Sequence, residues 1–159
     1  VKRVRSILAG DVPVVEVSWD VVQEDGTWRS VWQTADGAAG HHRNSANPGE
    51  AGNVMIAGHH NTRGEVFRDL SEVGQPGNAL QEGSEIILVA EDGRRFTYTM
   101  TAWDRFAVED GAGSASQEYD RYLATGIRPI VTLITCWPYE SNSHRVVVIA
   151  ELQPSDQGQ

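Results

Sequence analysis

The chain has 159 residues, of which 40% are hydrophobic and 22% are charged, and its formal net charge is −9 at pH 7. A chain of this length suits one compact domain and can bury a sizeable core without disulfides. The acidic balance, with Lys2 as the one lysine, argues against a nucleic-acid partner and against an anionic membrane surface, because both require a basic face. No stretch approaches the ~20 apolar residues of a membrane span.

The first half of the chain reads as short strands separated by loops. Apolar and polar residues alternate over 12–22, which predicts a half-buried strand, with the pattern carried by Val15, Val17, Trp19 and Val21. Residues 24–28 read as a turn, and 30–36 as a second short strand. Residues 37–53 are rich in Gly, Asn, Ser and Pro, so we expect a loop in which His41 and His42 are exposed. Residues 53–60 read as a buried strand that ends in His59 and His60.

The second half contains a hairpin and two further apolar runs. Apolar residues at helical spacing predict a short helix over 65–73. Residues 84–108 form two β-rich runs around an Asp-Gly turn, and 117–126 read as a second short helix that Gly126 ends. Strands then follow at 130–136 and from 145 onward. The whole pattern, about seven or eight short strands, predicts a mostly antiparallel barrel or sandwich.

Three potentially reactive side chains lie at the ends of predicted core strands. Cys136 is the single cysteine, and Pro138 shows that its strand ends there. The residue is either a small buried apolar group or a reactive thiol. His59 and Arg145 mark the ends of two other apolar runs. If these strand tips converge, a thiolate can attack a carbonyl, an imidazole can move protons, and a guanidinium can stabilise the oxyanion.

The remaining histidines suggest no metal site. Two adjacent histidines on a strand point to opposite faces, so neither His-His pair easily chelates one ion. No HExxH helix or cysteine pair is present. We therefore predict no metal and no cofactor, and we expect His144 to be an exposed loop residue.

These motifs resemble the sortase family. Sortases carry a histidine in an A-G-H motif, a T-L-x-T-C motif, and an arginine on the next strand, and here NVMIAGHHNTRGEVFRDL, TLITC and the strand at Arg145 occur in the same order. The resemblance spans residues ~30–152. It implies a closed eight-stranded sortase-type β-barrel with two or three short helices in its connections.

The resemblance also implies a function. Sortases are bacterial cysteine transpeptidases that cleave a sorting signal of surface proteins, of the LPXTG or LAXTG type, between Thr and Gly. The acyl chain passes through a cysteine thioester to an amine of a cell-wall precursor or a pilin. Cys136 would be the nucleophile, His59 the general acid and base, and Arg145 the oxyanion and substrate-binding group. His60 would point the other way on a regular strand, so His59 is the predicted catalytic histidine.

The predicted substrate-binding residues come from the two segments that flank the cysteine strand. The connection at ~105–128 forms a wall of the sorting-signal groove in the family. Here it carries Phe106, Val108, Tyr119, Tyr122, Leu123 and Ile127, of which Phe106 and Val108 are the predicted substrate-binding residues. By family analogy the backbone N–H of Cys136 or of Thr135 could assist Arg145 in stabilising the oxyanion. Trp137 and Tyr139, just after the cysteine, could frame the groove or could cap the barrel. Asp69 is a weak candidate to orient the histidine, and more simply an exposed charge.

The resemblance implies the following organisation. Residues 1–159 form a single catalytic domain that acts as a monomer on the outer face of the cell membrane or in the cell wall. The chain starts at Val1, so 1–11 would be an extension cut from a membrane anchor, and 153–159 a frayed tail. The anchor would be the one link to the membrane. The short loop after Cys136 argues against the pilus-building class. Two alternatives remain: a cysteine peptidase with water as acceptor, and a non-catalytic β-barrel binding module.

Overall fold

The computed structural model describes residues 3–6, 10–33, 35–108, 121–122 and 126–156. Its strands and helices are β1 (Arg3–Ser6), β2 (Gly10–Val17), β3 (Trp19–Glu24), β4 (Thr27–Trp32), β5 (Ala39–His42), β6 (Asn53–Ala57), α1 (Arg68–Ser71), β7 (Glu85–Val89), β8 (Arg95–Ala107), β9 (Ile130–Trp137), β10 (His144–Leu152) and the 3-10 helix η1 (Pro154–Asp156). The prediction of a mostly β fold with little helix is confirmed.

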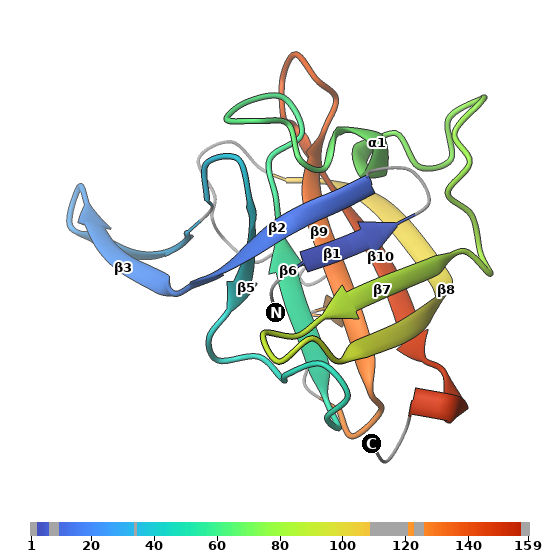
Figure 1. Cartoon of the computed structure of the whole chain (residues 1–159). Helices are drawn as coiled ribbons and strands as arrows, with labels where there is room; N and C mark the ends of the chain where they lie inside the picture. The colour runs from blue at the N-terminus through green and yellow to red at the C-terminus, as the bar shows by residue number, and fades with distance from the viewer. Residues whose placement is uncertain (1–2, 7–9, 34, 109–120, 123–125, 157–159) are drawn as a thin grey trace.

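The main sheet curls round on itself (Figure 1). Its strands are hydrogen-bonded in the order β1-β2-β5-β6-β9-β10-β8-β7, and β1 also pairs with β7, so the order returns to its start. The pairs β2–β5 and β6–β9 are parallel, and the other pairs are antiparallel. Strand β1 lies within the segment 1–11 that we expected to be an extension. Its backbone groups pair on both sides, which closes the edges that β2 and β7 would otherwise expose.

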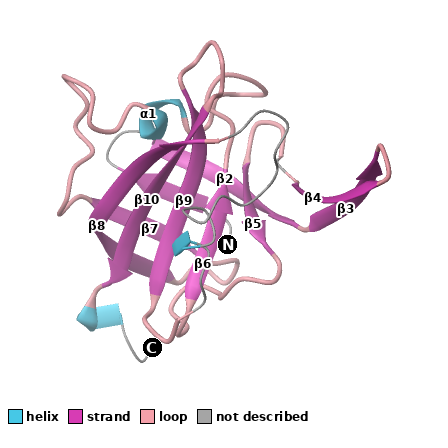
Figure 2. Ribbon diagram, turned by 180° about the vertical axis from the view of Figure 1, so that it is seen from behind, coloured by secondary structure: helices cyan, strands magenta, loops and turns pink. Residues whose placement is uncertain are grey.

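Strands β3 and β4 form a separate hairpin that projects away from the barrel (Figure 2). The turn lies at Asp25 and Gly26, which both have positive φ, at 48° and 75°. Two consecutive positive φ angles are typical of a two-residue hairpin turn. The predicted turn over 24–28 and the predicted hairpin over 84–108, which is β7–β8, are both confirmed.

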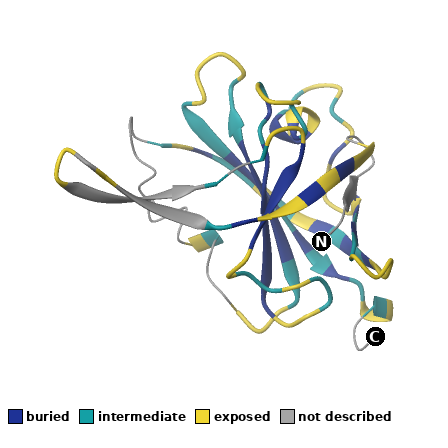
Figure 3. Ribbon diagram, turned by 60° about the vertical axis from the view of Figure 1, so that its left-hand side comes forward, coloured by how far each residue is buried: buried dark blue, intermediate teal, exposed yellow. Residues whose placement is uncertain are grey.

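The core fills the inside of the barrel. Strand β10 sends Val146, Val148 and Ala150 into it, and β9 sends Val131 and Leu133, in the alternating pattern of a sheet. Figure 3 shows the buried strand segments, in dark blue, gathered at the centre of the molecule. A second, smaller apolar cluster, which we call the outer cluster, contains Ala57, Phe106, Ile134 and Val147. Strand β9 therefore buries both faces, which explains why its sequence is an almost unbroken apolar run.

Helix α1 is shorter than predicted. It covers a single turn, Arg68–Ser71, within the segment 65–73 that we expected to be helical. Phe67, Leu70 and Val73 nevertheless pack on the barrel core, as their helical spacing indicated. The second predicted helix, at 117–126, lies mostly outside the described residues.

The predicted phase of the first strand is wrong at Val15, which is 45% exposed, whereas Val12 and Val14 are buried. Val17 is buried, as its place in the pattern indicated, and the side chains of Trp19 and Val21 lie outside the described part. Residues 10–13 of β2 pair with β1, and residues 14–17 pair with β5 on its other edge. The alternation of buried and exposed side chains breaks just after this change of partner.

The prediction that His41 and His42 are exposed loop residues is also wrong. They form half of β5 and are 5% and 0% exposed. The Gly-rich segment shows no local strand pattern, because β5 is stabilised by its pairing with the distant strands β2 and β6. Its sequence alone therefore did not predict a strand. His144 begins β10, half-buried, instead of lying in a loop.

Candidate active site

Cys136 and Arg145 lie directly opposite each other on neighbouring strands. They are paired positions in the antiparallel ladder of β9 and β10, near the end of β9 and the start of β10. Side chains of directly opposed residues project from the same face with Cβ atoms about 5 Å apart. The structure therefore brings together the thiol and the guanidinium that the sequence singled out, and Cys136 is a free, partly buried thiol.

His59 follows the strand on the other side of β9. Strands β6 and β9 run parallel, with Ala57 opposite Ile134. The ladder continues one step past β6, because the Gly58 N–H donates to the Ile134 carbonyl at 3.0 Å. His59 directly follows Gly58 after β6, and Cys136 lies two residues after Ile134 on β9. The strands β6, β9 and β10 are neighbours in the sheet (Figure 2). The cysteine and the arginine lie on β9 and β10, and the histidine follows β6 at the same end.

Cys136 shares its face of the sheet with the outer cluster. Ile134 is two residues before it on β9, and Val147 is two residues after Arg145 on β10, so all four side chains project from the outside of the barrel. Residues 121–122 of the connection between β8 and β9 cover this face. The Asn53 amide donates to the Tyr122 carbonyl at 3.0 Å, and the Tyr122 ring stacks on Phe106 at 5.9 Å.

The surroundings oppose spontaneous formation of a thiolate–imidazolium pair. Burial raises the pKa of the Cys136 thiol, and the positive charge of Arg145 partly offsets this by lowering it. Burial also lowers the pKa of His59, and Arg63 lowers it further, whereas Asp36 acts in the opposite direction. The neutral thiol and neutral imidazole are therefore the main forms at pH 7.

The Arg145 guanidinium is oriented by two backbone carbonyls. Its Nη1 donates to the Asn142 carbonyl at 3.0 Å and to the His144 carbonyl at 3.2 Å. Among the described residues, no carboxylate forms a salt bridge with it. Its charge is thus available to the thiol and to a substrate oxygen.

The predicted substrate-binding residues divide into two groups. Phe106 belongs to the outer cluster on the Cys136 side of the sheet and is 9% exposed, and Val108, partly buried, packs against that cluster. Thr135 is buried, and its hydroxyl donates to the Gly58 carbonyl at 2.8 Å, so its side chain ties β9 to β6. Two further residues of the predicted groove wall, Tyr119 and Leu123, lie outside the described residues.

Trp137 and Tyr139 play different structural parts. Trp137 packs against the barrel core and carries the Arg105 guanidinium on its ring at 4.2 Å, which corresponds to the barrel-capping alternative. Arg105 in turn donates to the carbonyls of Ser71 and Val73 beside α1. Tyr139 is 39% exposed and lies in the loop after Cys136, where its hydroxyl donates to Glu65 at 2.7 Å.

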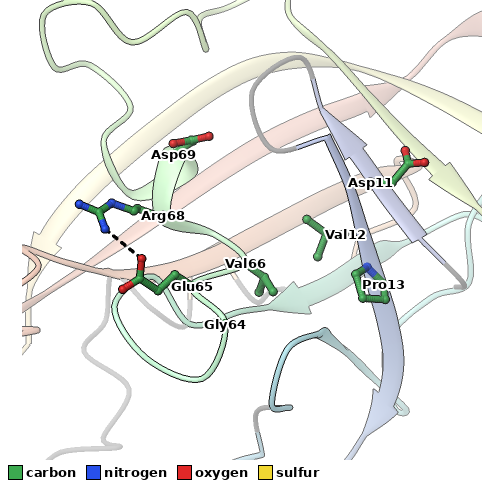
Figure 4. A pocket seen from close by; sticks show the side chains of 8 residues that line it. All are labelled: Asp11, Val12, Pro13, Gly64, Glu65, Val66, Arg68 and Asp69. Atoms are coloured by element: carbon green, nitrogen blue, oxygen red, sulfur yellow. Dashed lines mark hydrogen bonds and ion pairs between the residues drawn. The ribbon is translucent and has the colours of Figure 1, made fainter.

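The pocket shown in Figure 4 is not the candidate active site. It has a volume of 240 Å³ and lies between the start of β2 and the segment 64–69, lined by Asp11, Val12, Pro13, Gly64, Glu65, Val66, Arg68 and Asp69. Neither the cysteine nor the histidine nor the arginine described above contributes to it. Asp69, the weak candidate to orient the histidine, is an exposed residue of this pocket.

Within the described part of the chain, no three His, Cys, Asp or Glu residues gather in a way that could hold a metal ion. In the same part, no helix is long and apolar enough to cross a membrane.

Sequence reasoning did not find two residues beside the three groups. Asn61 and Asn142 make hydrogen bonds beside the site. They are single polar residues in loops, with no spacing pattern. The one available signal was that Asn61 lies two positions after His59.

Comparisons with known proteins identify the family of the chain. The family model described as Sortase domain matches residues 11–153. The chain therefore belongs to the sortase family, which is a family of cysteine transpeptidases. No curated protein matches the chain at a significant level.

Solved sortase structures share the fold. A Clostridium perfringens Sortase D5 transpeptidase matches with a TM-score of 0.64 and 24% identity, over 95% of this chain and 77% of its own. A lid mutant of sortase A from Corynebacterium diphtheriae matches with a TM-score of 0.66 and 23% identity, over 97% and 72%. Streptococcus agalactiae sortase C1, in complex with MTSET, matches with a TM-score of 0.66 and 19% identity, over 96% and 66%.

Proposed function

We propose that this sortase cleaves a sorting signal of the LPXTG or LAXTG type between Thr and Gly and transfers the acyl chain to an amine. Cys136 is the nucleophile, His59 the general acid and base, and Arg145 the group that stabilises the oxyanion. The observation that carries this assignment is the register of β9 and β10, which sets Cys136 opposite Arg145, with His59 following the strand on the other side.

The reaction begins with attack of the Cys136 thiolate on the threonine carbonyl carbon. The carbonyl oxygen becomes an oxyanion, and the guanidinium of Arg145 lies across the ladder to receive it. The intermediate collapses as the Thr–Gly C–N bond breaks. His59, as imidazolium, gives its proton to the leaving glycine amine, which leaves a thioester on Cys136.

The second half of the reaction reverses these roles. A free amine attacks the thioester carbonyl, neutral His59 takes the proton that this amine loses, and the Cys136 thiolate leaves. Because the cysteine pKa is raised and the histidine pKa is lowered, the reactive ion pair is a minority form at neutral pH. We therefore expect a bell-shaped pH dependence of kcat/KM, with its acid limb set by His59 and its alkaline limb by Cys136.

The connection between β8 and β9 supports the substrate assignment. Tyr122 holds the end of this connection against Phe106 on the face that carries Cys136. We propose that a bound peptide lies between this connection and β9, with Phe106 and Val108 on one side. By family analogy the chain forms one catalytic domain that acts as a monomer at the outer cell surface, on surface-protein substrates and a cell-wall or pilin amine.

The first experiment offers the purified protein a panel of LPXTG-like and LAXTG-like peptides, with and without triglycine as the amine. Products are followed by mass spectrometry, beside Cys136→Ala, His59→Ala and Arg145→Gln. His144→Gln is a control for the loss of a nearby histidine, because its ring packs on Trp137 and not on the site face.

We expect cleavage after Thr and a triglycine adduct with the unmodified protein and the control, and neither product with Cys136→Ala. Cleavage without an adduct would make the protein a peptidase with water as acceptor. If no peptide is cleaved and Cys136 also resists iodoacetamide in the folded protein, the catalytic assignment is wrong and a binding module takes its place.

A further inference from the structure

The loop after His59 binds the loop after Cys136. His60 is buried, with 1% of its surface exposed. Burial lowers the pKa of its ring, and a hydrogen bond with the backbone of Pro138 acts in the opposite direction. Because proline has no N–H, the ring must be the donor and the Pro138 carbonyl the acceptor. His60 therefore follows the candidate catalytic histidine directly and holds the residue two positions after the candidate nucleophile.

Asn61 makes the next contacts between the same two loops. Its Nδ2 donates to the Tyr139 carbonyl at 2.5 Å and to Oδ1 of Asn142 at 3.0 Å. Asn142 also accepts a hydrogen bond at its backbone carbonyl, from Nη1 of Arg145 at 3.0 Å, so its two oxygens serve the two partners separately. Asn142 therefore links Asn61, two residues after His59, to Arg145.

A second layer supports these contacts from the solvent side. The Tyr139 hydroxyl donates to Glu65 at 2.7 Å, and Glu65 forms an ion pair with Arg68 at 2.9 Å, which is also drawn in Figure 4. The Arg68 guanidinium lies over the Tyr139 ring at 4.8 Å. The His60 and Tyr139 rings form a T-shaped contact with their centroids 6.0 Å apart. The loop after Cys136 is therefore held by residues 60–68 on its inner and outer sides.

Such contacts matter because His59 lies beyond the end of β6, whereas Cys136 and Arg145 are held by the β9–β10 ladder, so strand pairing alone does not fix the histidine relative to the other two groups. Proton transfer and nucleophilic attack depend on placement within a fraction of an ångström. Together with the β6–β9 pairing and the contacts of Tyr139 with Glu65 and Arg68, the contacts of His60 and Asn61 connect the loop after His59 to the loop after Cys136.

We propose that His60 and Asn61 are positioning residues that set His59 relative to Cys136 and Arg145. This inference rests on the proposed function for its meaning. It also gives the second histidine of the His-His pair a role: His59 reacts, and His60 holds the opposite loop in place.

The test compares Asn61→Ala with Asn78→Ala. Asn78 is a matched control, because it also donates from Nδ2 to a backbone carbonyl, that of Asp69, at 2.8 Å, but it contacts neither loop of the site. For the second positioning residue, His60→Asn retains a donor near the position of ring Nδ1, whereas His60→Leu removes it. Each variant is measured for peptide kcat and KM, for the pH dependence of kcat/KM, and for its unfolding midpoint.

We expect Asn61→Ala to lower kcat by about tenfold with little change in KM, and Asn78→Ala to leave both nearly unchanged. In Asn61→Ala the loosened loops admit water, so the His59 pKa rises and the Cys136 pKa falls. The bell-shaped pH profile of kcat/KM therefore becomes narrower. His60→Asn should keep most of the activity that His60→Leu loses. A fall in Asn61→Ala no larger than in Asn78→Ala, with an unchanged pH bell, would overturn the proposal.

Two further measurements keep the test decisive. If Asn61→Ala does not fold, Asn142→Gly removes the acceptor from the other side, and glycine tolerates the φ of 56° at that position. If the unmodified protein cleaves no peptide, the proposed function fails separately. The pH midpoint of Cys136 alkylation by iodoacetamide then decides: a shift in Asn61→Ala but not in Asn78→Ala supports the positioning role, and equal midpoints refute it.

Discussion

Buried His42 makes the stability of the protein sensitive to acid. Its side chain is 0% exposed, and burial, together with His41 beside it, lowers its pKa from 6.5 to about 4. Between these two pH values the unfolded chain takes up a proton that the folded protein does not. The free energy of unfolding must therefore fall as the pH falls through this window. At about 1.36 kcal/mol per pH unit, the interval amounts to roughly 3 kcal/mol.

Urea unfolding, followed by tryptophan fluorescence at pH 7 and pH 4, measures this loss directly. We expect His42→Gln to reduce the difference in unfolding free energy between the two pH values by up to about 3 kcal/mol, whatever its own stability at pH 7. His144→Gln, a half-buried histidine on β10, controls for the loss of a histidine elsewhere. If His42→Gln shows the same pH dependence as the unmodified protein, His42 is not the buried neutral group that the structure indicates.

Three further predictions concern the site and its supports. Arg145→Gln should move the alkylation midpoint of Cys136 to higher pH, because the positive charge that lowers the thiol pKa is lost. Gly58→Ala should cost about 1–3 kcal/mol in urea unfolding, because its Cβ would lie 2.7 Å from a ring carbon of the buried Phe67. Tyr122→Phe should cost about 1 kcal/mol, because its hydroxyl donates to a carboxylate on β8, and the ring stacking remains.

Each of these has a direct control. Arg145→Lys retains the charge and should keep the midpoint nearer its original value. Gly126→Ala introduces a methyl group whose nearest neighbour is the Arg128 nitrogen at 3.9 Å, so it should be nearly neutral. Tyr122→Leu removes the ring as well as the hydroxyl and should cost more than Tyr122→Phe. An unchanged alkylation midpoint in Arg145→Gln would contradict the effect of the arginine charge on the thiol. Equal losses of unfolding free energy in Gly58→Ala and Gly126→Ala would contradict the packing argument. Equal losses in Tyr122→Phe and Tyr122→Leu would contradict the separate contribution of the ring.

The sequence was most informative where a local pattern and the tertiary structure agree. The β-branched run before Cys136 and the proline after it located the end of β9, and the run from Arg145 located the start of β10. Two consecutive strands joined by a short loop pair in antiparallel fashion, which places these two residues opposite each other. The meeting of thiol and guanidinium therefore followed from features within about twenty residues of sequence.

Features that depend on distant partners could not be predicted in this way. His41 and His42 form a strand through β2 and β6, and nothing in their Gly-rich surroundings indicates this pairing. Trp137 could have faced either the groove or the barrel, and its contact with Arg105 and the core decides the question. The bonds of Asn61 to the loop after Cys136 span 78 residues or more and have no local signature.

The parallel pairing of β6 with β9 has a consequence for how the protein acquires activity. The bond between Thr135 and the Gly58 carbonyl joins residues 77 positions apart, and β7 and β8 lie between them in the chain. Contacts over such distances close large loops and form slowly during folding. A partly folded chain, or a nascent one whose last strands are still being synthesised, would hold its histidine and its thiol apart. Peptide cleavage should then appear late in refolding, in step with completion of the barrel and not with its earliest hairpins.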